Sequence, residues 1–424
     1  MQSCTIEAAP AATFESANKL RGLFPAIVAE PQTVFFDNAS TAQKPAVVID
    51  RINRFYSREC SNISRASYGR STVLAARVEE TRLKVAEFLN ADPEEIAFTG
   101  GATESLNTVA LSWGMHNLND QDEIMLCMED HHSAVFPWLN LQEVLSRFGK
   151  KIKIIPFSLH HTGVYDWADI ESKISARTRL IALGHVHHLY GMEMDIAEIK
   201  ALLPDNVLIS LDASQSAGHI KLDTRALGAD FVSFSGHKMF AASGVGVLYT
   251  KKSILQQLWP SKSGSKTAFQ IDKENMTLSA ERLSGIIECG TLNIAGILSL
   301  KTAIEFIDSI GIETIERQLS DLTHYLHGRL KELAAIEFSP GIGRCGCTKG
   351  FGIIAFKLKK FDSPDLADYL DSEGILVRAG DHCRGSKEEE EEEEDDSYIR
   401  VSLQIYNTRE EIDFFMEVLE DACS

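Results

Sequence analysis

The stretch Phe231-Val-Ser-Phe-Ser-Gly-His-Lys238 is a short apolar run that leads directly into a loop carrying a lysine. A second apolar run, Val245–Tyr249, follows Gly244. A lysine in a loop is usually a solvated charge, so the meaning of Lys238 depends on its surroundings. The rest of the chain shows that these two runs belong to a longer series.

Between about Val34 and Leu300, short apolar runs alternate with amphipathic segments such as 73–89 and 142–148, which we expect to be helical. Strands that alternate with helices predict an α/β fold with a mostly parallel sheet, covered on both faces. The expected strands are Ile96–Thr99, Glu123–Cys127, Ile152–Ile155, Leu180–Leu183, Val207–Leu211, Phe231–Phe234 and Val245–Tyr249. In such sheets ligands bind beyond the carboxyl ends of the strands.

The pattern changes after Leu300. We expect an interrupted helical region over 301–335, strands over 350–356 and 375–377, and a closing helix over 412–422. The chain has 424 residues, 44% of them hydrophobic, which is enough for more than one domain. We therefore predict an N-terminal segment (1–33) that packs with the smaller domain, a large domain (34–300) and a smaller α+β domain (301–424).

Composition narrows the possible partners and location. The net charge of −19 argues against nucleic acid and anionic membranes, although nine consecutive acids at 388–396 supply almost half of it. Apolar runs are too short to span a bilayer, which takes about 20 residues. Residues 1–14 lack a basic region followed by an apolar core, so we expect a cytoplasmic protein.

Eight cysteines are scattered without the framework typical of a disulfide-rich protein. Cys345-Gly-Cys347 has no second close pair, so we interpret both as loop or buried thiols, not as half of a zinc site, with a redox role as the alternative. The acidic run 388–396 is expected to be a flexible insertion or a tail for partner docking, because adjacent like charges repel and solvate.

Several motifs at strand ends match the needs of pyridoxal 5′-phosphate (PLP): a lysine, a phosphate cradle, an anion for the pyridine nitrogen and a flat group against the ring. Thr99-Gly-Gly-Ala-Thr-Glu104 follows a strand and opens a helix, where free N–H groups favour an anion. Ser235 and His237 can donate to the same phosphate. An ordinary capped turn is the alternative for each motif taken alone.

The ring contacts come from two other strand ends. Asp212 ends one strand and can keep the pyridine nitrogen protonated, while Gln215 can bond the phenolic oxygen. His131 follows another strand and can stack on the ring and shuttle protons, so we expect it to be catalytic. Zinc is a rival explanation for His131-His132 with His185, His187 and His188, but no acidic or thiol ligands stand at a supporting spacing, so we expect no metal.

A cysteine and two arginines form a further group. Cys383 ends Arg378-Ala-Gly-Asp-His-Cys, where flanking charges favour a reactive thiolate, although a lone buried thiol is the usual alternative. Arg400 begins the expected strand Val401–Ile405 and can grip a substrate carboxylate, or else form a surface salt bridge. We expect Arg378 to bind substrate as well.

These residues, in this order, resemble the cysteine desulfurase and selenocysteine lyase family of the class V aminotransferases, most closely its group II (SufS-like) branch. The resemblance covers nearly the whole chain. Its motifs are Phe36–Pro45, Gly101-Ala-Thr-Glu104 with Asn107, His131-His132 before Pro137-Trp138, Asp212-Ala-Ser-Gln215, Ser235-Gly-His-Lys238, Gly290-Thr-Leu-Asn293, Arg378–Cys383 and Arg400 before Tyr406-Asn407.

The resemblance implies a homodimer of fold-type I subunits, each with a mostly parallel seven-stranded sheet. Lys238 would link to PLP, and Asp212, Gln215 and His131 would contact its ring. The phosphate would be held by Ala102, Thr103, Ser235 and His237, with Thr291 from the neighbouring subunit.

The resemblance also implies a reaction. Cys383 would attack the sulfur of a substrate cysteine, giving alanine and an enzyme persulfide, while Arg400 binds the substrate carboxylate. A sulfur-acceptor protein is a possible partner. As a hypothesis, the acidic run 388–396 guards access of an acceptor with a basic surface.

Three features depart from that branch. His188 stands where the family usually has an asparagine near the cofactor oxygen and the substrate, and Tyr68 stands where the branch has a histidine near the pocket. The segment between Cys383 and Arg400, usually apolar or aromatic, is mostly glutamate. We expect His188 and Tyr68 to border the substrate. A PLP-dependent C–S lyase, epimerase or aminotransferase-like enzyme is therefore the alternative function, and a non-catalytic scaffold a further one.

Overall fold

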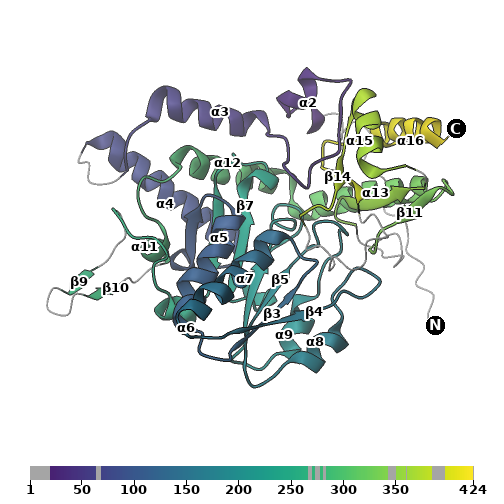
Figure 1. Ribbon diagram of the computed structural model, residues 1–424. Coiled ribbons are helices and arrows are strands. Elements are labelled where there is room, and N and C mark those ends of the chain that lie inside the picture. The colour runs from purple at the N-terminus through teal and green to yellow at the C-terminus, as the bar shows by residue number, and fades with distance from the viewer. Residues whose placement is uncertain are drawn as a thin grey trace.

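A seven-stranded sheet forms the centre of the larger part of the molecule (Figure 1). The computed structural model describes residues 20–63, 68–265, 270–272, 277–279, 283–341, 350–359, 361–383 and 397–423. The strands of this sheet are β2 (Ile96–Thr99), β3 (Glu123–Cys127), β4 (Lys153–Phe157), β5 (Thr178–Gly184), β6 (Leu208–Asp212), β7 (Phe231–Ser235) and β8 (Gly246–Thr250). All seven were expected from the sequence, two of them with identical bounds and the others with bounds that differ by one or two residues.

The order of the strands is β2-β8-β7-β6-β5-β3-β4, and β8 alone runs antiparallel to its two neighbours. The prediction of a mostly parallel sheet in an α/β fold is therefore confirmed. The parallel strands all end at one edge, so the loops that follow β3, β5, β6 and β7 lie together there. These loops carry most of the residues singled out in the sequence.

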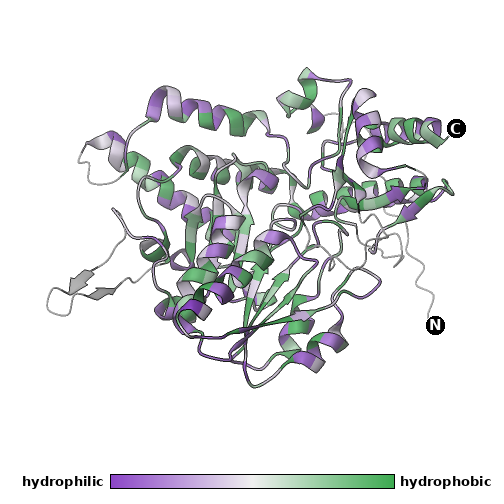
Figure 2. Ribbon diagram, in the orientation of Figure 1, coloured by the Kyte–Doolittle hydropathy of each residue, from purple (hydrophilic) through white to green (hydrophobic). Residues whose placement is uncertain are grey.

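Helices cover both faces of the sheet because successive side chains of each strand point to opposite sides. In β5, Ile181 and Leu183 join one apolar cluster with α4 (Gly69–Leu89) and α12 (Ile294–Ile310). Leu180 and Ala182 join a second cluster with α7 (His132–Arg147). Figure 2 shows the hydrophobic strands enclosed between helices whose outer faces are hydrophilic.

The remaining elements of this part are short. They are α2 (Pro25–Ala29), α3 (Ala46–Arg54), η1 (Phe55–Glu59), η2 (Pro93–Glu95), α5 (Ala102–Val109), η3 (Ala110–Gly114), α6 (Met115–Asn117), α8 (Trp167–Lys173), α9 (Ile196–Leu202), α10 (Thr224–Leu227), η4 (Gly236–Lys238), η5 (Lys252–Gln257), the hairpin β9 (Gln270–Asp272) with β10 (Thr277–Ser279), and α11 (Leu283–Ile287). The expected helix over 142–148 is the second half of α7, which begins at His132.

A second, antiparallel sheet of four strands forms the centre of the C-terminal part. Its order is β11 (Ile336–Phe338), β12 (Ile353–Leu358), β15 (Tyr398–Ser402) and β14 (Arg378–Gly380). The helices α13 (Ile312–Leu330), α15 (Ser363–Ser372) and α16 (Arg409–Cys423) pack against it. The short strand β13 (Ile375–Leu376) pairs instead with β1 (Val34–Phe35).

The helical region expected over 301–335 consists of two helices, α12 and α13. Helix α12 begins at Ile294, before the expected start, and its residues are buried on most sides, so its first half belongs to the core of the large sheet. The predicted domain boundary at 300 and 301 falls inside this helix, and the division into domains stays a prediction.

The chain from Val34 to Ala39 runs along the smaller sheet. Val34 lies opposite Ile375 in the pairing of β1 with β13, and Asp37 forms a bridge with Ser402. This segment enters the site described below. No helix among the described residues is long and apolar enough to cross a bilayer. Cys345, Cys347 and the acidic run 388–396 lie outside the described residues.

Candidate active site

A cavity of about 260 Å³ lies at the carboxyl ends of β3, β5, β6 and β7, facing β14 and β15. It brings together most of the residues that the sequence singled out. These are Ala102, Thr103, His131, His188, Asp212, Gln215, Ser235, His237, Lys238, Arg378, Cys383 and Arg400. The cavity is also lined by residues for which the sequence predicted no role in a PLP site, namely Ala39, Ser40, Asp130, Ser133, Ala134, Gly184, Val186, His187, Ser214 and His382.

Lys238 ends the short turn η4 directly after the fully buried strand β7. Its amine makes no hydrogen bond or ion pair with any described residue. The loop itself is fixed, because the carbonyl of His237 accepts hydrogen bonds from the amide of Ala42 at 3.1 Å and from the amine of Lys44 at 2.9 Å. Burial lowers the pKa of Lys238 to about 8, although Asp212 raises it. This amine is therefore available as a nucleophile.

A cradle for an anion lies beside Lys238, where β2 ends and α5 begins. The backbone nitrogen of Ala102, the first residue of α5, donates to the Ser235 hydroxyl at 2.8 Å. The hydroxyls of Thr103 and Ser133 are 2.8 Å apart. Two helix starts, those of α5 and α7, thus bring hydroxyls and backbone donors to one place, an arrangement that favours an anion.

The close approach of β8 makes this cradle possible. A Cβ atom on Gly246 would lie 2.5 Å from the Cα atom of Gly101, so no larger residue fits there without displacing the turn. The sequence motif Gly244-Val-Gly246 is explained in this way: the second glycine lets β8 pack directly against the cradle. This contact ties the cradle to β8, the neighbour of the edge strand β2.

Asp212 is the last residue of β6, and its carboxylate accepts a hydrogen bond from the backbone nitrogen of Ser214 at 2.9 Å. The side-chain nitrogen of Gln215 donates to the carbonyl of Ala39 at 2.9 Å. The hydroxyl of Ser214 is buried without a hydrogen-bond partner. A carboxylate and an unpaired hydroxyl therefore face a cavity whose other wall is the segment Ala39–Ser40.

His131 caps the start of α7. Its Nδ1 atom accepts from the backbone nitrogen of Ser133 at 3.1 Å, which assigns the proton of the neutral ring to Nε2. Burial lowers the pKa of His131 to about 4, against the opposing effect of Asp212, so the ring is neutral at pH 7. A neutral, flat ring at this edge of the cavity is what stacking on a cofactor requires.

His188 packs edge-on against His131, with 5.2 Å between the ring centroids, and is only 5% exposed. Its Nε2 atom is buried without a hydrogen-bond partner. Burial lowers the pKa of His188, and the neighbouring His187 and His131 lower it further. The ring is neutral and holds an unsatisfied nitrogen, which is costly unless a bound ligand satisfies it.

Arg400, buried at 4% exposure, lines the cavity on the side of β15. Its Nη1 atom donates to the carbonyl of His188 at 3.0 Å, and its Nη2 atom donates to the Ser40 hydroxyl at 2.9 Å and to Asp37 at 3.3 Å. Arg378 binds both oxygens of Asp37, at 3.2 and 3.0 Å. Sequence reasoning missed Asp37 as a site residue, although the motif Phe36–Pro45 contains it.

Cys383 is exposed on the loop after β14 and borders the cavity. Cys383 and His382 have φ angles of 60° and 58°, the left-handed region that non-glycine residues seldom adopt. The loop is held in this conformation by hydrogen bonds. Backbone nitrogen of Cys383 donates to Asp381 at 3.1 Å, and the His382 ring lies 2.8 Å from the carbonyl of Tyr398.

Asp130 is a buried carboxylate at the back of the cavity that sequence reasoning missed. Burial raises the pKa of Asp130 to about 7, although a hydrogen bond from Tyr165 lowers it. The Tyr165 hydroxyl donates to Asp130 at 2.8 Å and accepts from the backbone nitrogen of Gly184 at 2.7 Å. Only its position one residue before His131 hinted at a role.

Two predicted residues do not line the cavity of this chain. Tyr68 lies at the start of α4 with 53% of its surface exposed, and Thr291 is exposed just before α12. Thr291 was predicted to act in a neighbouring subunit, and that contact stays a prediction, as does the place of Tyr68 near the substrate. No group of three or more potential metal ligands occurs in the described part of the chain.

The residues present fit PLP. The anion cradle suits its phosphate, Asp212 suits its pyridine nitrogen, and the unpartnered amine of Lys238 suits its aldehyde. The unpaired Ser214 hydroxyl and the Nε2 atom of His188 are buried polar atoms that a bound group with oxygens can satisfy. The donor set is therefore that of a PLP site.

Comparison with known proteins agrees with this assignment. The family model for aminotransferase class-V matches residues 34–415. A probable cysteine desulfurase of Halalkalibacterium halodurans is 35% identical over 410 residues, 96% of this chain and 97% of that protein. A cysteine desulfurase of Cronobacter sakazakii is 34% identical, covering 94% and 96%. The apo structure of a cysteine desulfurase from Thermococcus onnurineus is similar with a TM-score of 0.85 and 29% identity, covering 96% and 97%.

Proposed function

This chain belongs to the class V aminotransferases, and we propose that it is a PLP-dependent cysteine desulfurase that acts on cysteine or selenocysteine. The observation that carries the proposal is one cavity lined by the free amine of Lys238, the thiol of Cys383 and the guanidinium of Arg400. An amine for the cofactor, a nucleophile for the sulfur and a cation for the carboxylate are the three groups that the reaction requires.

The reaction balances without an oxidant or reductant. The Cys383 thiol takes the sulfur of the substrate, and the Cβ–S bond of the substrate breaks. The products are alanine and a persulfide on Cys383. PLP, when bound, supplies the electron sink that makes the bonds at Cα and Cβ labile.

The residues of this chain would divide the remaining work among them. Ala102, Thr103, Ser235 and His237 would hold the phosphate of PLP. Asp212 and Gln215 would contact its ring, against which His131 would stack. Because the neutral His131 ring carries its proton on Nε2, it can donate a hydrogen bond into the cavity.

Lys238 would hold PLP, and its amine would hold and move protons in the cavity. An amine with a pKa of about 8 is partly neutral at pH 7 to 8, so it can both accept and return a proton. The amine lies in the cavity without a competing hydrogen bond among the described residues. No rearrangement of a hydrogen bond is therefore needed before it acts.

Arg400 would bind the substrate carboxylate, and the rigid loop would present Cys383 to the sulfur. The unpartnered Nε2 atom of His188 faces the same space and would contact the substrate or the cofactor oxygen beside it. His188 stands where the resembled family usually has an asparagine near the substrate. The proposed substrate is therefore tested by identifying the reaction product.

Product analysis tests the proposed function. The purified holoenzyme, given cysteine and a reductant, should form alanine and sulfide in equal amounts, and Cys383→Ala should abolish both. Cys423→Ala, which removes an exposed thiol in α16, is the matched control and should change neither. Pyruvate and ammonia in place of alanine, or turnover that survives loss of Cys383, would overturn the proposal in favour of a C–S lyase.

We also propose a cytoplasmic homodimer in which Thr291 completes the phosphate site of the neighbouring subunit, and a sulfur-acceptor protein as partner. The similarity to cysteine desulfurases supports an amino acid as the small-molecule partner. Sedimentation of the full chain tests the dimer.

Replacing residues 388–396 by a Gly/Ser linker tests the acidic run, and unchanged acceptor-dependent turnover would contradict a role in partner access.

A further inference from the structure

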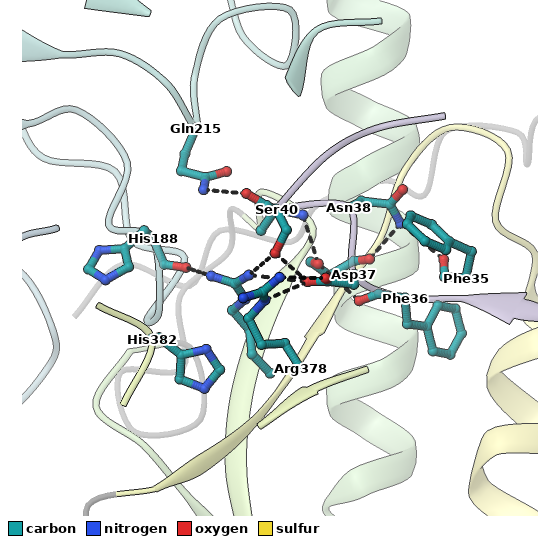
Figure 3. Close-up of polar contacts among 12 residues, drawn as sticks. Phe35, Phe36, Asp37, Asn38, Ser40, His188, Gln215, Arg378 and His382 are labelled. Carbon is teal, nitrogen blue, oxygen red and sulfur yellow. Dashed lines mark hydrogen bonds and ion pairs between the residues drawn. The ribbon is translucent and has the colours of Figure 1, made fainter. Parts of the chain in front are cut away.

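Asp37 and two arginines form a charged triad beside the cavity. Arg378 of β14 and Arg400 of β15 are directly opposite each other in the antiparallel pairing of these strands. Like charges in this relation repel. Asp37 accepts hydrogen bonds from both guanidinium groups. Figure 3 shows Asp37 beside Arg378, with dashed lines between them. The one carboxylate therefore compensates one of the two positive charges.

Asp37 is held in place by the backbone on both sides of it. The carbonyl of Phe36 accepts from the backbone nitrogen of Ser402 at 2.7 Å, and the backbone nitrogen of Ala39 donates to the Ser402 hydroxyl at 2.8 Å. Ser40 donates to Asp37 at 2.6 Å. The main chain that carries Asp37 is therefore fixed, and the hydrogen bonds from Ser40 and the two arginines hold the carboxylate between them.

The charges of the triad are fixed at neutral pH. Arg378 and Arg400 hold the pKa of Asp37 below its usual range, against the opposing effect of burial. Burial lowers the pKa of Arg400 to about 10, which still leaves it protonated. Two cations and one anion leave a single net positive charge on this side of the cavity.

The free hydrogen-bond donors of Arg400 also suit one substrate carboxylate. A guanidinium has five N–H groups. Nη1 gives one to the carbonyl of His188, and Nη2 gives one each to Asp37 and Ser40. The Nε–H group is buried without a partner. Two of the five N–H groups of Arg400 therefore remain free, which is enough for one carboxylate. A substrate carboxylate can also take the place of Ser40 on Nη2.

We propose that Asp37 determines substrate class: it keeps this wall of the cavity at one net positive charge, so that the site selects amino acids with one carboxylate over those with two. The inference rests on the proposed function, which supplies the amino-acid substrate. Asp37 itself is a positioning and charge-setting residue, because it acts through the two arginines. An acidic side chain on the substrate would find no second free cation among these three residues.

Binding of unreactive anions to the holoenzyme tests the proposal without relying on turnover. Propionate and succinate carry one and two carboxylates and no amino group, and calorimetric titration gives their dissociation constants. In the unaltered enzyme we expect succinate to have no advantage over propionate. In Asp37→Asn, with two net positive charges, succinate should gain on the order of tenfold relative to propionate.

Charge-restoring variants separate this role from a structural one. Arg378→Gln alone should weaken propionate binding on the order of tenfold, because the wall loses its net charge. The double variant D37N with R378Q should return the ratio of the two anions to that of the unaltered enzyme. Ser40→Ala, which removes an uncharged contact of the same groups, should leave the ratio unchanged.

An unchanged ratio in Asp37→Asn, a changed ratio in Ser40→Ala, or failure of the double variant to restore the ratio would each overturn the proposal. If Asp37→Asn does not fold, the Arg378→Gln variant tests the proposal instead. Unaltered binding of propionate to Arg378→Gln would contradict the proposed net charge of the cavity wall. Formation of alanine from cysteine is measured separately. Failure of the proposed function and failure of this inference are therefore distinguishable.

Discussion

The backbone nitrogen of His132 donates a hydrogen bond to the carbonyl oxygen of Cys383, with 2.8 Å between the two atoms. His132 is the first residue of α7, which packs on the seven-stranded sheet, whereas Cys383 follows β14 of the smaller sheet. A backbone donor at a helix start, which needs a partner, thus holds the proposed nucleophile loop. The loop is anchored to both sheets.

Loss of the His382 anchor is expected to impair the nucleophile and spare the cofactor. The ring of His382 contacts the carbonyl of Tyr398 at 2.8 Å, so His382→Ala should lower the free energy of unfolding by about 1 kcal/mol. A displaced sulfur should slow alanine formation on the order of tenfold or more. The absorbance of bound PLP, measured in parallel, should not change; its loss would contradict a role confined to the loop.

Reconstitution of the apo protein with PLP should depend on pH through Lys238. The pKa of this lysine is about 8, against 10.5 for an ordinary lysine, and only the neutral amine is nucleophilic. The rate should rise about tenfold from pH 7 to pH 9 and then level off. Stopped-flow absorbance measures it. A rate that keeps rising above pH 10 would show an ordinary lysine.

Gly246→Ala should damage the cradle for the phosphate. The added Cβ atom would lie 2.5 Å from the Cα atom of Gly101, and overpacking of this kind costs about 1 to 3 kcal/mol. Urea unfolding should show this loss, and the affinity for PLP should fall. Gly264→Ala is the matched control, because no atom lies within 4 Å of its added Cβ; an equal loss in both variants would refute the close-packing argument.

His188→Leu should stabilise the apo protein and weaken its reaction. The variant removes a buried Nε2 atom that has no hydrogen-bond partner, which should raise the free energy of unfolding by about 1 kcal/mol. The same change removes a contact to the ligand, so KM for cysteine should rise. Denaturant titration and steady-state kinetics measure the two effects. A less stable apo protein would indicate that the ring serves the fold.

The large sheet was predictable because most of its strands are short apolar runs buried on both faces, as the fully buried β7 and β8 illustrate, although the edge strand β4 is only partly buried. The start of α12 at Ile294 was missed because its first turns are as apolar as a strand and carry no polar face. The strand predicted over 350–356 is β12, which begins three residues and ends two residues further along the chain.

The cavity was largely predictable because the chemistry of PLP demands few residue types, and these follow strand ends that meet at one edge. Asp37 and Asp130 could not be found in this way. Asp37 gains its role from Arg378 and Arg400, more than 340 residues away in sequence. Asp130 gains its raised pKa from burial, against the opposing hydrogen bond from Tyr165, and only the folded chain reveals both.

The mixed origin of the site has a consequence for its motion. Lys238 and Asp212 are carried by the seven-stranded sheet, whereas Arg400 and the loop of Cys383 are carried by β15 and β14 of the smaller one. Any rocking of one sheet against the other would change the distance between Arg400 and Lys238, and the hydrogen bond from His132 to the carbonyl of Cys383 would have to adjust with it. The positions of the substrate carboxylate and of the thiol would then change in the same motion.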